Sequence, residues 1–356
     1  MRIWQARGDR GDLRVRSARS DRASAAPVIL GLLLVIALFA LAGCDIGPTY
    51  APPVRIATAP WLGYTPFYIA RDRGLYGDME VRIAEFSTDF DAARAVLDGR
   101  VEVMCGTFAD ILRQRDQGAD LKIVAALDFS KGADGIVARA PIADVAGLRG
   151  KRVGVEIGTL THFVLLRAIE RANVKVEEIT LVNFAMDGAL EALEKGDLDA
   201  ASLWEPFLSK AEKSGARRVF SSAEIPGEIL DVLAVPGDVL AARPRDIERV
   251  LRGWDGALGV IAAEPEATMP KMAERMGMSV PELKESLTTI ELVDLKQNRR
   301  LFERSGGAGS IWDAYSRAAS FMTQNSLLNR PAADPEAVLK PFLIQREQRE
   351  PREAAP

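Results

Sequence analysis

Along most of the chain, short runs of apolar and β-branched residues alternate with segments whose apolar residues recur at helical spacing. Strands are predicted at Val54 to Thr58, Glu80 to Ala84, Val101 to Met104, Leu121 to Ala126, Arg152 to Val155, Ile179 to Val182 and Ala200 to Leu203. Helices are predicted between them at Pro66 to Arg73, Asp89 to Leu97, Phe108 to Gln117, Thr161 to Ala172 and Gly188 to Lys195. This alternation is typical of an α/β fold with parallel strands. After Pro244 the pattern predicts helices with few strands, at Asp246 to Ala263, Pro265 to Met276, Pro281 to Leu287 and Ser310 to Asn325.

Turn-forming residues divide this body into three stretches. Ala133 to Gly135 and the pair Pro236-Gly237 bracket a middle section of about a hundred residues. If the chain crosses to a second lobe near the first point and returns near the second, residues 54–135 and 236–343 form one lobe. Residues 136–235 then form the other lobe, and a cleft lies between the two.

An apolar run from Val28 to Ala42 lies near the start of the chain, after several arginines. It is shorter than the roughly 20 residues that span a bilayer, and it matches the apolar region of a secretory signal. Leu41-Ala42-Gly43-Cys44 resembles the bacterial lipoprotein processing box. We therefore expect residues 1–43 to be a lipoprotein signal peptide, Cys44 to carry the lipid and residues 44–53 to form a tether. A membrane helix or uncleaved anchor with an incidental cysteine is the alternative.

Charge and rare residue types exclude several classes of protein. Residues 1–43 carry seven arginines and three aspartates, a net charge of +4, so the rest of a chain of net charge −4 carries −8. An acidic body argues against a nucleic-acid partner. A single histidine, His162, excludes multi-histidine metal sites and most histidine relays, and two cysteines are too few for a disulfide framework. We expect no metal and no cofactor, and a disordered charged tail over residues 344–356.

Threonines stand where predicted strands lead into helices. Thr107 precedes one predicted helix, and Thr159 and Thr161 flank the start of another. In open α/β sheets, ligands bind at this edge, where a hydroxyl and free backbone N–H groups suit an anionic oxygen such as that of a sulfonate, nitrate or carboxylate. Ordinary capping of the helix by threonine is the alternative for each residue.

Aromatic and acidic residues follow other predicted strands. The aromatic residues could line a cleft for an apolar or planar ligand, or could pack as a lid. The acidic residues and their neighbours could bind a cationic group, cap turns or hold the lobes closed. His162, one turn into a helix, is a neutral hydrogen-bond donor or a packed core residue. The aromatic candidates are Trp61, Tyr64 and Trp204, and the candidates of the second group are Asp128, Ser130, Asp134 and Glu205.

Several stretches together resemble one family, the substrate-binding proteins of nitrate/sulfonate/taurine-type ABC importers, which includes binders of pyrimidine precursors of thiamine. The resemblance runs from about Val54 to Phe342. The resemblance rests on the stretches together and on their order behind a lipoprotein box. They are WLGYTPFYIARDRGLYG, LDFSKGADG, LRGKRVGVEIGT, AASLWEPF and EIPGEILDVLAV.

The resemblance implies an α/β, two-lobed periplasmic-binding-protein type II fold, with mixed sheets flanked by helices and two crossover hinges. It implies closure on a small molecule that is presented to an ABC permease and its ATPase. We expect a monomer, lipid-anchored at the periplasmic or extracellular face of the membrane. Asp128 and Glu205 near the site disfavour a bare anion, so a zwitterion or neutral heterocycle fits more easily. Carried over by position, the cleft is lined by Trp61 to Tyr64, Thr107, Asp128 to Ser130, Thr159 to His162 and Trp204-Glu205.

Two rival functions remain open. The same fold family includes a thiamine-pyrimidine synthase, whose cysteine-rich signature is absent here, and an aromatic sulfinate desulfinase. A desulfinase-like enzyme would have Cys105 and His162 as the only thiol and imidazole of its mature chain. A surface-tethered sensor or adhesin is the other rival. Because no catalytic residues cluster in the sequence, we expect a binding protein rather than an enzyme.

Overall fold

The computed structural model describes residues 52–87, 89–304 and 309–342. The expected signal peptide, the lipid-bearing Cys44 and the charged tail at 344–356 lie outside the described residues. In the part of the chain that is described, no helix has both the length and the apolar composition needed to cross a bilayer.

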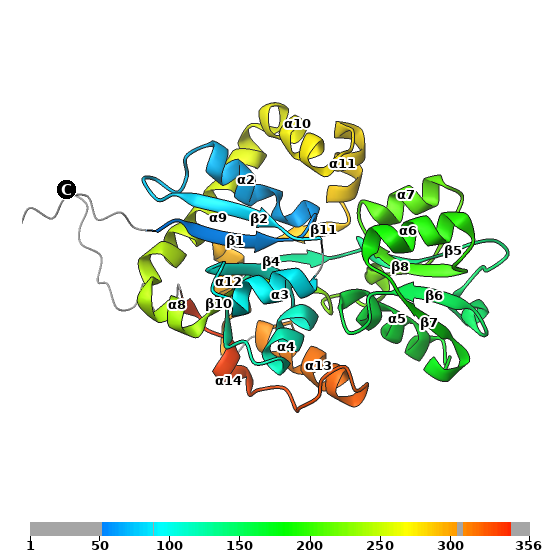
Figure 1. The fold of residues 1–356 in the computed structure, drawn as a ribbon. Coiled ribbons are helices and arrows are strands. Elements are labelled where there is room, and N and C mark those ends of the chain that lie inside the picture. The colour runs from blue at the N-terminus through cyan, green and yellow to red at the C-terminus, as the bar shows by residue number, and fades with distance from the viewer. Residues whose placement is uncertain (1–51, 88, 305–308, 343–356) are drawn as a thin grey trace, which may run out of the picture. The chain divides into compact units, whose positions relative to one another are not determined.

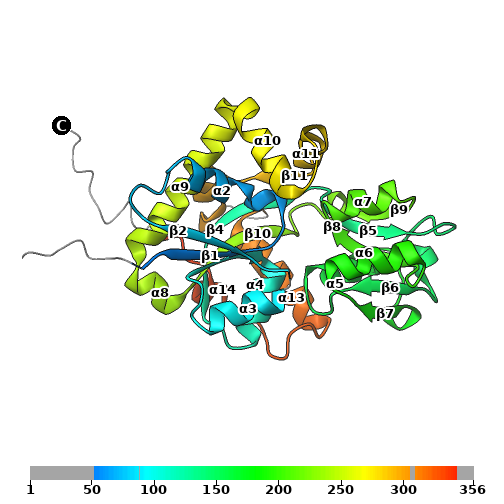
Figure 2. The same ribbon diagram turned by 45° about the horizontal axis from the view of Figure 1, so that its top comes forward.

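Two mixed β-sheets, each with helices on both faces, organise the described residues (Figures 1 and 2). The sheets with their helices are called the first lobe and the second lobe. In spatial order the six-stranded first sheet consists of β11 (Ile290–Leu292), β4 (Leu121–Ser130), β10 (Leu230–Pro236), β3 (Val103–Thr107), β1 (Val54–Thr58) and β2 (Val81–Glu85). The five-stranded second sheet consists of β7 (Thr180–Asn183), β6 (Arg152–Val155), β8 (Ala200–Trp204), β5 (Asp134–Ala138) and β9 (Arg217–Ser221).

Helices cover both sheets. The first lobe carries η1 (Leu62–Tyr64), α2 (Thr65–Asp72), α3 (Asp89–Leu97), α4 (Phe108–Asp116), α8 (Gly237–Ala242), α9 (Pro244–Ala263), α10 (Pro265–Met276), α11 (Val280–Leu287), α12 (Leu295–Leu301), α13 (Ile311–Gln324) and α14 (Pro335–Val338). The second lobe carries η2 (Val145–Leu148), α5 (Leu160–Arg171), η3 (Val176–Glu178), α6 (Met186–Lys195) and α7 (Phe207–Lys213), and η4 (Ser222–Glu224) lies in the connection back to the first lobe.

Alternating side chains of the strands supply the core on both faces of each sheet, as the pleat of a strand requires. In β3, Val103 and Cys105 pack in the cluster that includes α2 and α9, whereas Met104 packs in the cluster that includes α4 and α13. In β5, Ile136 faces the cluster of α5, and Val137 faces that of α6 and α7. The central strands of both sheets are therefore buried on both sides, which explains why strands such as β3, β5 and β8 are almost continuously apolar.

The predicted elements are all present, with ends that differ by a few residues, and four strands were missed: β5, β9, β10 and β11. The expected mixed sheets are confirmed, because β5, β10 and β11 run antiparallel to their neighbours, whereas the sequence alternation alone had indicated parallel strands. The expected return of the chain after Val235 also differs from the structure. β10 lies between β3 and β4 in the first sheet, so the chain has already left the second lobe before Leu230.

Both connections between the lobes meet at one buried hydroxyl. The chain leaves β4 at Ser130 and enters β5 at Asp134, and it returns from β9 through η4, which begins at Ser222. Ser222 Oγ lies 2.7 Å from Ser130 Oγ and accepts a hydrogen bond from Gly132 N at 2.7 Å. Ser222 is fully buried, so this contact ties the outgoing and returning segments together at the hinge.

A side chain completes the edge of β4 where strand pairing stops. β11 pairs only with residues 128–130 of β4, so the backbone of Ala126 has no strand partner on that side. The buried side chain of Asn298 replaces the missing strand: its Oδ1 accepts from Ala126 N at 2.7 Å, and its Nδ2 donates to Ala126 O at 2.9 Å.

Asn298→Ala is expected to lower the free energy of unfolding by about 2–4 kcal/mol, because it leaves two buried backbone groups without partners. Urea unfolding followed by circular dichroism measures this change. Lys296→Ala, an exposed change in the same helix, is the control and should cost less than about 0.5 kcal/mol. Equal stabilities of the two variants would contradict the proposed role of Asn298.

Candidate functional site

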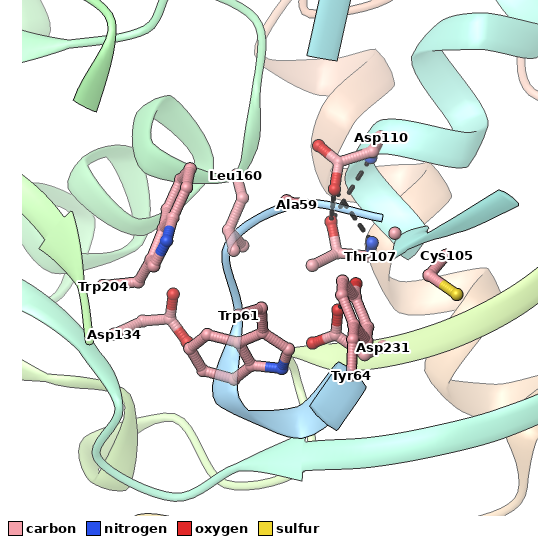
Figure 3. Close-up of a pocket in the computed structure, with 11 residues that line it drawn as sticks. Ala59, Trp61, Tyr64, Cys105, Thr107, Asp110, Asp134, Leu160, Trp204 and Asp231 are labelled. Atoms are coloured by element: carbon pink, nitrogen blue, oxygen red, sulfur yellow. Dashed lines mark hydrogen bonds between the residues drawn. The ribbon is translucent and has the colours of Figure 1, made fainter. Parts of the chain in front are cut away.

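A cavity lies between the two lobes, and both lobes line it (Figure 3). It outlines about 430 Å³ of unfilled space, part of which is open to solvent. The first lobe contributes Ala59, Trp61, Tyr64, Cys105, Gly106, Thr107, Asp110 and Asp231, and the second lobe contributes Asp134, Leu160 and Trp204.

Strand direction explains why these residues meet. The parallel strands β1, β3 and β8 present their carboxyl ends to the cavity, the edge at which open α/β sheets bind ligands. The antiparallel strands β10 and β5 present their first residues to the same place. Asp231 is opposite Thr107 of β3, and Asp134 is opposite Trp204 of β8.

Two aromatic side chains of the turn after β1 are held by buried carboxylates. Trp61 Nε1 donates to Asp128 Oδ2 at 3.1 Å, and the Tyr64 hydroxyl donates to Asp231 Oδ1. Asp128 and Asp231 are themselves paired across β4 and β10. The positions of both rings at the cavity are therefore set by the first sheet and not by the turn alone.

Gly63 lies directly against one of these hydrogen bonds. A Cβ atom at this position would be 2.2 Å from Asp128 Oδ2 and 2.4 Å from Trp61 Nε1. A Cβ atom at such distances would force Asp128 or Trp61 to move, so glycine permits their close approach.

The start of α4 already holds a carboxylate. Asp110 Oδ2 accepts from Thr107 N at 2.8 Å and from Thr107 Oγ1 at 2.7 Å, and Asp110 N donates to Thr107 Oγ1 at 3.3 Å. These contacts form a capping box. Thr107 thus lines the cavity, but its hydroxyl and N–H serve the helix, and Asp110 occupies the place that an anion would take.

Asp134 has a buried carboxylate oxygen that receives no hydrogen bond from the described part of the chain. It is only 2% exposed, and its Oδ2 has no hydrogen-bond partner among the described residues. Burial raises the pKa of Asp134 to about 7, opposed by a hydrogen bond from Ser130 and reinforced by the charges of Asp110 and Glu205. Figure 3 shows this carboxylate extending toward the Trp61 indole, beside Trp204.

The neighbouring carboxylates are also difficult to ionise. Burial raises the pKa of Asp128 to about 7, with the charge of Asp134 adding to the effect. Burial and the charge of Asp128 raise the pKa of Asp231 well above its ordinary range. Within the described residues, no group of three or more His, Cys, Asp or Glu side chains is arranged to hold a metal ion.

The predicted residues at the start of α5 do not line the cavity. Thr159 Oγ1 donates to Glu156 O at 2.8 Å, Thr161 Oγ1 accepts from Glu156 N at 2.9 Å, and His162 Nδ1 accepts from Gly158 N at 3.2 Å. The loop thus uses these groups for its own backbone. Burial, assisted by Arg113, lowers the pKa of His162, so its imidazole is neutral. Between these residues, Leu160 lines the cavity instead.

Three other predicted residues also lie outside the lining. Asp128 accepts the hydrogen bond from Trp61, and Ser130 belongs to the hinge contact with Ser222. Glu205 accepts from Ser209 Oγ at 2.8 Å and lies 3.5 Å from Arg218, so it latches α7 and β9 within the second lobe.

The structure therefore brings Trp61, Tyr64, Thr107 and Trp204 together around the cavity. Leu160 falls within the predicted stretch Thr159 to His162, and Asp134 was among the acidic candidates at the hinge. As site residues, sequence reasoning missed Asp110 and Asp231. Asp110 had a readable signal, because an acid three residues after a threonine at a helix start indicates a capping box. Asp231 had none, since β10 was not predicted.

A model of the family described as NMT1/THI5 like matches residues 61–268. The chain belongs to this family. A protein of Escherichia coli (strain K12) named for the binding of aliphatic sulfonates is 27% identical over 216 residues, which cover 58% of this chain and 65% of that protein. The chain thus matches somewhat less than two thirds of the length of this relative.

Solved structures show the same fold in other members of this structural class. The periplasmic aliphatic sulphonate binding protein SsuA from Escherichia coli superposes with a TM-score of 0.65 and 20% identity, over 81% of this chain and 98% of that one. The desulfurization enzyme DSZB superposes with a TM-score of 0.61 and 18% identity, over 84% and 99%. The NMT1/THI5-like chain therefore has the periplasmic binding protein fold that the sequence indicated.

Gly63→Ala is expected to separate Trp61 from Asp128 and to lower the free energy of unfolding by about 1–3 kcal/mol. Tryptophan fluorescence and urea unfolding measure the two effects. Gly259→Ala is the control, because a Cβ there meets nothing within 4 Å in the middle of α9. That change should be neutral or stabilising. An unchanged Gly63→Ala protein would show that the close approach is unimportant.

The buried carboxylates predict a loss of stability as the pH rises. A folded-state pKa of about 7 against an ordinary value of 3.8 means that the folded chain keeps a proton that the unfolded chain loses between these values. Carboxylates whose pKa is lowered in the folded chain change the free energy of unfolding only below about pH 4. From pH 5 to pH 8 we expect the free energy of unfolding to fall by about 2–4 kcal/mol.

Asp134→Asn should remove part of this slope and should be more stable than the natural chain at pH 8 by about 1–3 kcal/mol. Asp197→Asn, an exposed change, should leave the slope unchanged. Urea unfolding at several pH values provides the measurement. A natural chain that is more stable at pH 8 than at pH 5 would refute the assignment of raised pKa values.

Proposed function

We propose that this chain is the solute-binding protein of an ABC-type importer and captures one small organic solute between its lobes. The observation that supports this function is the cavity, which is lined by tryptophans from both lobes, Trp61 and Trp204, above a hinge of two connections. A ligand that contacts both lobes at once favours the closed arrangement and shifts the population toward it.

Contacts across the cleft support closure as the working motion. Arg113 Nη1 donates to Ile157 O at 3.1 Å, joining α4 to the loop before α5. The rings of Phe163 and Phe321 lie 5.1 Å apart between α5 and α13, and Lys213 pairs with Glu282 on the other side. The exposed ion pair contributes little. The ring contact and the hydrogen bond hold the lobes together, and a bound solute would add to them.

The setting of the protein is proposed on the sequence and the family. Residues 1–43 would direct export, and Cys44 would carry a lipid that holds a monomer at the periplasmic or extracellular face of the membrane. A permease and its ATPase would receive the solute. The relative's name points to a sulfonate, and the wider family resemblance also includes taurine, nitrate-like anions and pyrimidines as solute classes.

The enzyme alternative has one observation in its favour, since Cys105 lines the cavity. Burial, together with the charges of Asp231 and Asp128, raises the pKa of the Cys105 thiol well above its ordinary range. A thiol attacks as its thiolate, so this environment disfavours a nucleophile. Incubation with aromatic sulfinates separates the two functions: turnover that Cys105→Ser abolishes would establish the enzyme, and stabilisation without turnover supports the binder.

Replacing a cavity tryptophan should weaken solute binding without unfolding the chain. A thermal-shift screen over sulfonates, taurine, nitrate, thiamine pyrimidines and amino compounds first finds a stabilising solute. Trp61→Phe and Trp204→Phe should each weaken its affinity by about tenfold, because each changes one wall of the cavity. Trp312→Phe, in α13 outside the lining, should leave the affinity unchanged.

Small-angle scattering should show a smaller radius of gyration on addition of the solute in the natural chain and in Trp312→Phe. If the solute is turned over, or if it binds with no change in scattering and equally to all variants, the binding-protein function fails.

A further inference from the structure

The charge of the cavity is opposite to what an anionic solute requires. Asp110, Asp134 and Asp231 line it, and no lysine, arginine or histidine is among the lining residues. A sulfonate or nitrate placed here would be buried beside carboxylates with no cation to compensate it, which is costly. At the start of α4, the N–H and the hydroxyl of Thr107, which could otherwise bind an anion, already donate to Asp110.

Asp134 is built to accept a hydrogen bond that the chain does not supply. It lies at the first position of β5, is nearly fully buried and lines the cavity, yet its Oδ2 has no partner among the described residues. A buried carboxylate oxygen without a donor is expensive unless a ligand brings one. This is an observation independent of the acidic lining, and it points to an N–H donor on the ligand.

The walls suit a cation with an apolar or flat body. Trp61, Tyr64 and Trp204 supply aromatic rings, whose faces attract positive charge when water is excluded. The buried Trp204 Nε1 also has no acceptor among the described residues. A ligand with an acceptor atom near its cationic nitrogen would satisfy it.

We propose that the solute is a small organic cation with N–H donors, an amine or amidinium, whose nitrogen binds Asp134 between the aromatic rings. This inference rests on the proposed solute-binding function and names the class of its ligand. Asp110 and Asp231 belong to the first lobe and Asp134 to the second, so the cation relieves repulsion between carboxylates as the lobes close. The same charge that excludes a sulfonate thereby favours closure.

Matched probes of one shape and different charge test this proposal. Benzamidine, benzamide and benzenesulfonate form one series, and acetamidine, acetamide and methanesulfonate form a smaller one. Isothermal titration calorimetry at about pH 8, where Asp134 ionises most readily, should give saturable binding of the amidinium probes only. We expect at least tenfold weaker binding, or none, for the neutral and anionic members.

Variants locate the charge contact. Asp134→Asn, which keeps the size of the side chain, should weaken amidinium binding by about tenfold or more. Trp204→Phe, which keeps the ring and removes its N–H, should weaken it less. Asp197→Asn on the exposed surface should have no effect. Circular dichroism and urea unfolding confirm that each variant is folded.

Several outcomes would overturn the cation proposal. These are tighter binding of a sulfonate than of the amidinium of the same shape, amidinium affinity that Asp134→Asn does not change, and no saturable binding of any amidinium up to about 10 mM. If a sulfonate or neutral solute nevertheless closes the lobes in scattering experiments, the solute-binding function stands and only the ligand class is wrong. If no solute of any charge closes them, the function itself fails.

Discussion

The buried contact between Ser130 and Ser222 is the constraint on which the cavity depends. It joins the two segments that connect the lobes, and Gly132 N and Asp134 N donate to the same Ser222 oxygen. Asp134 is therefore attached directly to the hinge through its own backbone. Any rotation of the second lobe about this point moves Asp134 relative to Asp231 across the cavity, so hinge motion and the electrostatics of the site are one coupled system.

The fold buries carboxylates in the site although a carboxylate is more stable in water. Asp128 and Asp231 are buried side by side, where the charge of Asp128 opposes ionisation of Asp231 and the charge of Asp134 opposes ionisation of Asp128. Among the described residues, Trp61 Nε1 and the Tyr64 hydroxyl are the side-chain donors to them. Such an arrangement costs stability in the free protein. A ligand that brings the missing donors and charge recovers part of this cost, which is how a strained site can bind tightly without a large contact area.

Periodicity was enough to predict most strands and helices, because the sheets are buried on both sides and their strands read as apolar runs. It failed for β5 and β10, the strands that follow the two crossovers, because each is bracketed by turn residues that read as a boundary. These two strands, of the four that were missed, carry Asp134 and Asp231. The aromatic members of the site, Trp61 and Trp204, were predictable because they directly follow or end strands that were recognised.

In proteins that share a fold, a few side chains determine whether the ligand is an anion or a cation. A helix that starts at a cavity offers free N–H groups and a positive dipole end, and this favours anions unless a side chain fills the position. In α4 the carboxylate of Asp110, three residues after Thr107, fills it, and two further aspartates enter from the strands after the crossovers. Because these carboxylates line the cavity and not the apolar cores of the sheets, the charge of the cavity can change from one family member to another while the fold stays the same.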